Sequence, residues 1–370
     1  MAFLLVSCDQ APGPDEQLQN KLVLLDLPAN EWVRYHESDW WRKGHSGMAY
    51  DSKRGHLLVF GSDTHGEDWD NAVHEFIPVE RRWVHHGSDA PKDTYRIDAD
   101  GIPVSGEGKI QPWSMHTYDG VAYDPVTDSV LVVGAPDHNP IGKAISGGRA
   151  KPVWRYPLVY CDTLSGTLEQ QQWEAIKPGS GKETGFFGAA TAFDISRKRL
   201  MICGGGLWEW PAGEEKIDKV GPGIGCLHRT MVFDSRRQDL YLFGAYKPST
   251  QVWRLQRDLA TDEPKSWLKL EPGGDAVPPY STSPVAFDQE NGVFLLVADN
   301  PGTDSDSSST FVYDPVRNAY QKVPNAVLPR VGMNFMMAWD AIHQVFFLVT
   351  GTWNTPTTVW AMRLDMSQLP

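Results

Sequence analysis

One pattern recurs six times along the chain and limits what the chain can fold into. Each copy is an apolar segment that ends in an aromatic residue and an aspartate, followed by a polar turn and a second apolar segment. In the first copy, Gly47–Asp51 and His56–Gly61 are joined by four polar or small residues. Such units predict a series of short antiparallel strands. The six aspartates are Asp51, Asp124, Asp194, Asp234, Asp288 and Asp340.

Several copies continue into a third segment that carries tryptophan, such as Val153–Tyr156 and Val252–Leu255. One small sheet cannot bury both of its faces, but sheets stacked around an axis can, with aromatic side chains filling the space between them. The 15 Trp, 34 Gly and 27 Pro of the chain suit many short strands and turns. The sequence resembles kelch and galactose-oxidase-type β-propellers over nearly its whole length. That resemblance implies an all-β propeller of four-stranded, kelch-like blades and says little about activity.

We expect six blades and a ring closed by an N-terminal strand. The last copy supplies three strands, whereas the spare segment Glu31–His36 precedes the first copy. Pairing this segment with the last blade removes both exposed edges. Seven blades follow instead if Lys21–Asp26 belongs to a degenerate extra blade. In either case residues 21–370 form a single propeller domain.

Residues 1–20 are interpreted as a tether that follows a truncated signal. Leu5-Val6-Ser7-Cys8 resembles a bacterial lipobox, in which the cysteine is lipidated. The stretch before Cys8 is short for the apolar region of a signal peptide and contains no Lys or Arg. Either the start lies inside a longer signal or the match is chance. The first reading predicts an exported lipoprotein, periplasmic or at the cell surface, with membrane contact only through a lipid on Cys8.

The charge balance restricts the partners. Asp and Glu number 47 against 34 Lys and Arg, a net charge of −13. Such a field disfavours nucleic acid and anionic membranes as partners. Motifs of nucleotide-binding loops, serine hydrolases and zinc proteases are missing from the sequence. We expect a monomer whose partner is a carbohydrate, and an anionic polysaccharide held at a locally basic pocket remains compatible with this charge.

Polar residues collect at one end of the predicted blades. There the start of the first strand and the end of the second lie side by side. Two histidine pairs occupy equivalent places in adjacent blades: His45 with His65, and His116 with His138. A single strand-end histidine often only hydrogen-bonds a neighbouring loop, but four at matching positions predict a shared site. We expect other residues of this face to bind substrate: Asp63, Trp69, Asp70, Asn71, Asn139, His228, Tyr280, Arg330 and Asn334.

These side chains suit β-elimination on a uronate-containing polysaccharide. A neutral His serves as a base near pH 7, and His⁺ or Arg offsets a carboxylate. In its fold and paired histidines the sequence resembles the propeller-type ulvan lyases, which implies a His pair, a Tyr and an Arg working together. Besides the four histidines we assign Tyr118 and Arg229 to catalysis, with Tyr280 and Arg330 as the other candidates for those roles. The alternative is a non-catalytic kelch module that binds a protein or glycan through this face.

The cofactor is left open, with a structural zinc or calcium ion as one possibility. The four cysteines are too few and too scattered for a disulfide framework. Cys226 and His228, with Cys203, are weak zinc candidates because C-x-H is not a standard zinc spacing, and buried inert thiols are the alternative. The four rim histidines are a second candidate metal site. A calcium site in the loop Asp304–Ser309 and copper chemistry at Cys161 have still less support.

Overall fold

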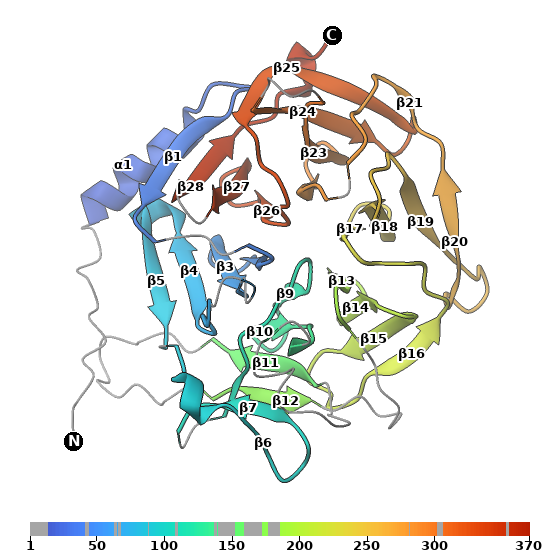
Figure 1. Ribbon diagram of the computed structural model, residues 1–370. Coiled ribbons are helices and arrows are strands. Elements are labelled where there is room, and N and C mark those ends of the chain that lie inside the picture. Colours follow the sequence, from blue (N-terminus) through green and yellow to red (C-terminus); the bar gives the residue numbers. More distant parts are fainter. Residues whose placement is uncertain are drawn as a thin grey trace.

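The computed structural model describes thirteen segments of the chain: 14–40, 44–62, 65, 68–87, 89–107, 110–136, 139, 152–158, 172–176, 186–280, 282–301, 306–352 and 355–370. Their strands form seven sheets, mostly four-stranded and antiparallel. Figure 1 shows the four- and five-stranded sheets arranged around a ring. The all-β fold and the propeller architecture predicted from the repeats are therefore confirmed. No helix among the described residues is long and apolar enough to cross a membrane.

Each four- or five-stranded sheet is called a blade below and is named by its strands. Within most blades, consecutive strands are neighbours, as the repeat predicts. The first three blades along the chain are β2 (Gly47–Asp51), β3 (His56–Phe60), β4 (Val73–Ile77) and β5 (Arg82–His86); β9 (Val121–Asp124), β10 (Ser129–Val132), β11 (Val153–Pro157) and β12 (Glu174–Ile176); and β13 (Ala190–Asp194), β14 (Arg199–Cys203), β15 (Leu207–Pro211) and β16 (Asp218–Gly221).

The remaining blades include two departures from this pattern. Strand β21 pairs parallel to β25, and the N-terminal β1 pairs antiparallel to β28. The members are β17 (Arg229–Asp234), β18 (Asp239–Gly244), β19 (Val252–Arg257) and β20 (Pro264–Leu270); β21 (Gly273–Gly274), β22 (Val285–Asp288), β23 (Val293–Asp299), β24 (Ser307–Asp314) and β25 (Ala319–Pro329); and β1 (Val33–Ser38), β26 (Met337–Asp340), β27 (Val345–Thr352) and β28 (Thr355–Met362).

Smaller elements decorate the ring. A three-stranded sheet of β6 (Arg96–Ile97), β7 (Pro103–Ser105) and β8 (Gln111–Pro112) lies in the long connection that follows β5. Short 3₁₀ helices cover Pro78–Glu80, Lys92–Thr94 and Met366–Gln368.

The repeated aspartates close the turn after the first strand of each blade. Each is almost fully buried, and its Oδ1 accepts backbone N–H groups of the following turn, as in Asp51 with Lys53 and Arg54. Its Oδ2 contacts the side chain three residues later. A carboxylate on a short side chain can satisfy both groups at once, which explains why aspartate recurs here. The Oδ2 partners are Arg54, Thr127, Arg197, Arg237, Asn291 and His343.

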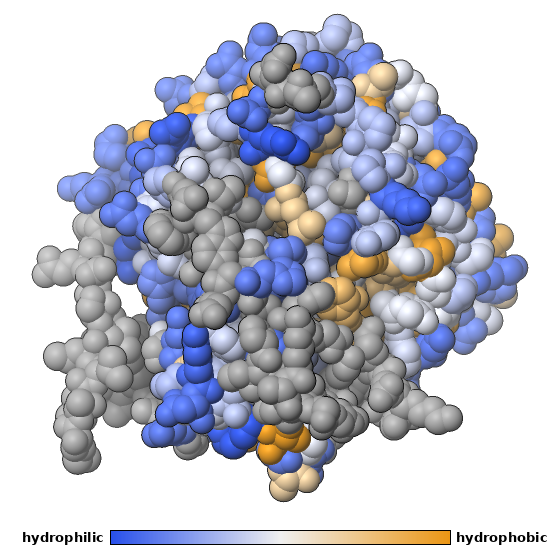
Figure 2. Space-filling view, in the orientation of Figure 1, coloured by the Kyte–Doolittle hydropathy of each residue, from blue (hydrophilic) through white to orange (hydrophobic). Residues whose placement is uncertain are grey.

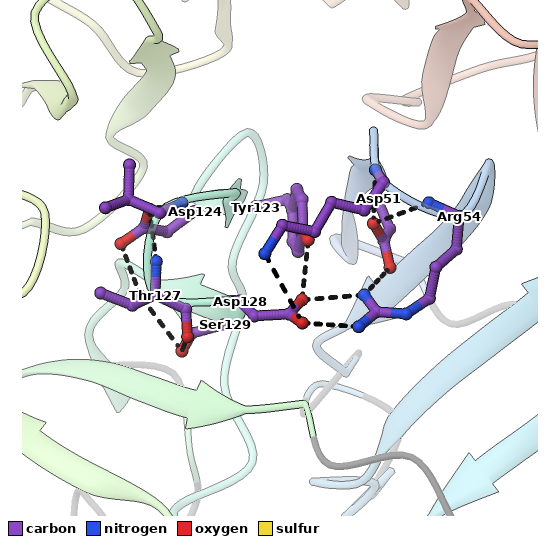
Figure 3. Close-up of polar contacts among 9 residues, drawn as sticks. Asp51, Arg54, Tyr123, Asp124, Thr127, Asp128 and Ser129 are labelled. Atoms are coloured by element: carbon purple, nitrogen blue, oxygen red, sulfur yellow. Dashed lines mark hydrogen bonds and ion pairs between the residues drawn. The ribbon is translucent and has the colours of Figure 1, made fainter.

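The same turns connect neighbouring blades. Figure 3 shows Arg54 between Asp51 of its own blade and Asp128 of the next. Its guanidinium donates to Asp51 at 2.7 Å and to both carboxylate oxygens of Asp128. The hydroxyl of Tyr123 also donates to Asp128. Together, the guanidinium and hydroxyl contacts hold the pKa of Asp128 below its usual range, against the effect of partial burial.

Aromatic side chains fill the space between blades, as the Trp content predicts. Phe60 of β3 packs against Trp173 with ring centroids 5.1 Å apart, and Trp154 of β11 is buried beside them. Burying such side chains contributes about 2–3 kcal/mol each. Packing between faces therefore holds the blades together, alongside the hydrogen bonds that the turns make from one blade to the next.

The N-terminal segment differs from the prediction. Residues 14–25 form helix α1 (Pro14–Leu25), so Lys21–Leu25 is not a strand of an extra blade. Asn20 donates to the carbonyl of Val79 at 2.9 Å, and Leu24 is fully buried against the blade surface. The predicted boundary at residue 20 falls inside this packed helix. Pro14 at its first position and the acids Asp15 and Glu16 in its first turn are the local signals for it.

Candidate functional site

One backbone position places the candidate side chains. The residue six before the repeated aspartate adopts a positive φ in four of the six repeats. In the third repeat this residue is Gly188, with φ 62°, but in the others it is His45 (63°), Tyr118 (52°) and His228 (62°). A left-handed conformation costs a non-glycine residue about 1–2 kcal/mol and occurs at turns as well as at functional sites. Nine other non-glycine residues of the described part also adopt it. Three large side chains thus occupy a backbone conformation that glycine adopts with the least strain.

Three histidines converge at this end of the ring. His45 stacks on His116, with centroids 4.1 Å apart and an interplanar angle of 10°. His65 meets both rings edge-on, at 5.6 and 4.7 Å. One ring nitrogen from each of the three lies within 4.8 Å of the others. With Tyr118 these residues are called the rim cluster.

Tyr118 joins the rim cluster from the blade that also supplies His116. Its hydroxyl lies 3.3 Å from His116 Nδ1, and its ring meets His45 edge-on at 5.3 Å. Phe187 and Phe335 pack against the ring at 5.5 and 5.7 Å, so only 4% of Tyr118 is exposed. The phenol is therefore held rigidly with its polar end beside an imidazole.

Asp119, the next residue, fastens Tyr118 to two other blades. Its Oδ2 accepts the backbone N–H groups of Thr191 in β13 and Met231 in β17, and the Thr191 hydroxyl donates to its carbonyl. Burial of the carboxylate raises the pKa of Asp119 well above its usual range, and the two N–H donors only partly oppose this. The acid thus favours its neutral form while it anchors the site.

His228 lies at the border of the rim cluster. Its ring is 5.6 Å from that of Tyr118 and 5.5 Å from that of Tyr246. Burial, and then the charge of His45, lowers the pKa of His228. Its Nδ1 is buried without a hydrogen-bond partner among the described residues.

The predicted arginines are engaged elsewhere. Arg229 donates to the carbonyls of Gly225 and Gly244, both at 2.6 Å, and burial lowers its pKa to about 10. Arg330 is largely exposed and pairs with Asp299 at 3.1 Å. These contacts do not bring either guanidinium to the rim cluster, where it was expected to bind a substrate carboxylate.

The other predicted binding residues have local partners. Asn71, Asn139 and Asn334 are fully buried, and each donates to a backbone carbonyl. Tyr280 is a core residue, and burial raises its pKa to about 12. Trp69 packs edge-on against Tyr95 beside the small sheet. Asp63 and His138 lie outside the described residues.

Cys203 and Cys226 form a disulfide, with their Cα atoms 5.9 Å apart. The sequence predicted inert thiols or weak zinc ligands here. Their sulfurs are bonded to each other, so they do not bind zinc in this state. The bridge links the end of β14 to the segment that precedes β17, which holds His228.

A second group of histidines was not predicted. His56 and His86 bind the two carboxylate oxygens of buried Glu75, at 2.6 and 2.7 Å. His74 contacts Asp70 through Nε2 at 2.7 Å, and its Nδ1 faces His85 Nδ1. These six residues of blade β2–β5 and its adjoining loop are called the outer-strand array: His56, Asp70, His74, Glu75, His85 and His86.

Hydrogen bonds between histidines and two carboxylates hold the array together, and an aromatic ring packs against it. Burial acts to raise the pKa of Glu75, but the hydrogen bonds from His56 and His86 outweigh it and hold that pKa well below the usual range. Burial, and then the positive charge of His74, lowers the pKa of His85. The ring of Trp40 lies 4.5 Å from that of His74. The sequence signal was a histidine beside an acid in one strand and two adjacent histidines in the next.

No protein-family model and no curated protein matches the chain. Many solved structures resemble it, and two of them cover most of both chains. The protein YjhT has 9% sequence identity over 91% of this chain and 99% of its own, with a TM-score of 0.56. A gluconolactonase from Xanthomonas campestris has 12% identity over 90% of this chain and 89% of its own, with a TM-score of 0.52. Both have propeller-type folds, and likeness at this identity shows the fold alone.

Proposed function

We propose that this protein is a carbohydrate-active propeller that cleaves a uronate-containing polysaccharide by β-elimination at the rim cluster. The observation that carries the proposal is the convergence of three histidines from separate segments on one point, with a tyrosine hydroxyl beside one of them. A non-catalytic binding face would hold its histidines against separate loops. The gluconolactonase in the comparison acts, by its name, on a sugar derivative, which supports the class of substrate.

The proposed roles follow from the contacts. Tyr118 passes its proton to His116, whose Nδ1 lies 3.3 Å away, and the phenolate takes the proton from C5 of the uronate. The electron pair of that C–H bond forms the C4–C5 double bond while the C4–O glycosidic bond breaks. The departing oxygen then recovers a proton through Tyr118. His45 and His65 bind the carboxylate, whose charge must be offset as C5 loses its proton.

The test is a panel of uronate polysaccharides with detection of the unsaturated sugar ends by their ultraviolet absorbance. Tyr118→Phe should lower kcat about 10²- to 10⁴-fold, the usual contribution of a general acid–base group. Tyr50→Phe is the matched control. It removes a tyrosine hydroxyl of β2, in another blade and away from the rim cluster, where it donates to Asp340. If no polymer is cleaved but a glycan binds, the protein is a non-catalytic binding module and the lyase proposal fails.

We also propose the finer features of the fold. Six blades of the kelch type would form the ring, and the pairing of β1 with β28 would close it, as expected from the spare segment before the first repeat. Deleting residues 31–38 should then abolish cooperative unfolding, because the last blade would lose its outer strand. Cooperative unfolding of the shortened chain would argue against closure by β1.

Export is proposed as well, and the Cys203–Cys226 disulfide supports it. Disulfides persist in oxidising compartments and are rare where thiols are kept reduced. The measurement is the molecular mass of the protein from periplasmic and from cytoplasmic fractions after thiol alkylation, which shows whether Cys203 and Cys226 were free to react. Protein that is functional in the cytoplasm with both thiols alkylated would contradict this localisation.

A further inference from the structure

We infer that His45, His65 and His116 form a binding site for one divalent transition-metal ion of the zinc class. The binding claim depends only on these three side chains. The role of the ion in catalysis, discussed below, rests on the lyase function proposed above.

The first argument is geometric. Zinc binds imidazole nitrogen at about 2.0–2.1 Å, so two ligands of a tetrahedral site lie about 3.4 Å apart. Nitrogens of the three histidines already lie within 4.8 Å of one another. His45 and His116 are stacked nearly parallel, so one ring would have to turn out of the stack for both nitrogens to face the ion. Imidazole is a preferred ligand for zinc, copper and nickel.

The second argument is the way the ligands are supported. His116 is 1% exposed and rigidly packed, His45 is half-buried, and His65 is exposed. The three come from separate segments, which fixes their relative positions through the fold rather than through one loop. This gradient of exposure leaves one side of the site facing solvent. Three protein ligands with one open position are typical of catalytic zinc sites.

The third argument is the second contact of His116. Metal-bound histidines almost always use their other ring nitrogen to contact a fixed polar group, which orients the ring. His116 Nδ1 lies 3.3 Å from the Tyr118 hydroxyl, a contact that orients the ring. The backbone strain at His45 and Tyr118 also fits residues retained for a site, because glycine suffices at the same position in the third repeat.

In the lyase mechanism such an ion would supply the positive charge at the substrate carboxylate. Arg229 and Arg330 were predicted for that role, but their guanidinium groups are bound elsewhere. A neutral histidine that binds an ion through one ring nitrogen carries its hydrogen on the other. With the ion bound, His116 would therefore donate to the Tyr118 oxygen, Tyr118 would release its proton to water, and the phenolate would take the C5 proton.

The experiment is titration of the chelator-treated full-length protein with zinc alone, followed by calorimetry, and with cobalt, followed by its visible spectrum. We expect one ion per chain and the intense absorption of tetrahedral cobalt. His65→Ala should weaken binding by more than about 100-fold, and Tyr118→Phe by about 10-fold. The matched control is His74→Ala, which removes a histidine of the outer-strand array and should leave binding unchanged.

The outcomes are distinct. Because His65 is exposed, His65→Ala should fold, and its unfolding temperature checks this. Binding that survives His65→Ala and His116→Ala, or that is lost in His74→Ala, would overturn the proposal. If the metal-free protein cleaves polysaccharide at full rate, the catalytic role of the ion is overturned, whereas the lyase proposal is supported. If zinc binds stoichiometrically but no polymer is cleaved, the result supports the metal site and contradicts the lyase proposal.

Discussion

The two histidine groups of this propeller are built in opposite ways. In the outer-strand array, His56 and His86 bind the same buried carboxylate, and His74 binds Asp70. In the rim cluster, His116 packs against His45 and His65, and its Nδ1 lies beside the Tyr118 hydroxyl. Carboxylates stabilise the charged or oriented form of an imidazole, whereas stacked imidazoles do not stabilise each other's charge. The carboxylate pairing of the array therefore suits a structural role, and the convergence of ring nitrogens in the rim cluster suits a chemical one.

The backbone supports the same division. The array lies on regular strands, where cross-strand pairs such as His74 and His85 follow from the register. The rim cluster contains two residues in the left-handed region, His45 and Tyr118. Regular pairing stabilises a fold, whereas retained strain points to function. Variants of the rim cluster should therefore affect activity, and variants of the array should affect stability. Measuring both quantities for each group tests this difference.

The largest effect is expected on activity. His65→Ala should lower lyase activity at least about 100-fold while changing the free energy of unfolding by less than about 0.5 kcal/mol, because an exposed side chain is lost. Rates on the responsive polysaccharide and urea unfolding give the two values. The control is His36→Gln on β1, which should change neither. A large loss of stability with unchanged turnover would make His65 a structural residue.

The next effect is on stability. Glu75→Gln should lower the free energy of unfolding by about 3 kcal/mol, because two half-buried histidines lose their common buried anion. Activity of the folded variant should persist. Glu174→Gln, at an exposed pair with Arg155, is the control and should cost less than about 1 kcal/mol.

The pH dependence gives a second measure for Glu75. Its pKa is lower in the folded than in the unfolded protein, so its contribution is fully present above the ordinary value of 4.5 and is lost as the pH falls toward the folded value. The difference between wild type and Glu75→Gln should therefore shrink in acid. A difference that stays constant from neutral pH into acid would contradict the buried anion.

The sequence predicts the positions of the rim cluster better than those of the outer-strand array. His45, Tyr118 and His228 stand at one position relative to the repeated aspartate, so the repeat alone brought them to one face. The array depends on which residues of β3, β4 and β5 face each other, and one residue of register decides that. The Cys203–Cys226 bridge was missed for a similar reason. Its partners are 23 residues apart and meet only through the blade geometry.

Asp119 should behave in the opposite way to Glu75. Its pKa is raised in the folded protein, so its contribution is fully present below the ordinary value of 3.8 and declines as the pH rises toward the folded value. Asp119→Asn keeps an oxygen for the Thr191 and Met231 N–H groups but cannot ionise. We expect it to gain about 1–2 kcal/mol over wild type at neutral pH and to lose that advantage near pH 4. Unfolding free energies across this range provide the check. A variant that is less stable at every pH would show that the carboxylate is charged and held by its donors.

The smallest effect tests the backbone strain directly. At His228, Gly and Ala both remove the ring, so any difference between the two variants comes from the backbone. Because φ is 62° there, His228→Gly should be more stable than His228→Ala by about 1 kcal/mol. Asn334 occupies the same position in the last repeat without a positive φ, and there the alanine variant should be the more stable. Equal stabilities at His228 would remove the strain argument for the rim cluster and leave only the convergence of its side chains. The expected reversal between the two positions would mean that the chain keeps a histidine where its own fold favours glycine, which a purely structural role does not explain.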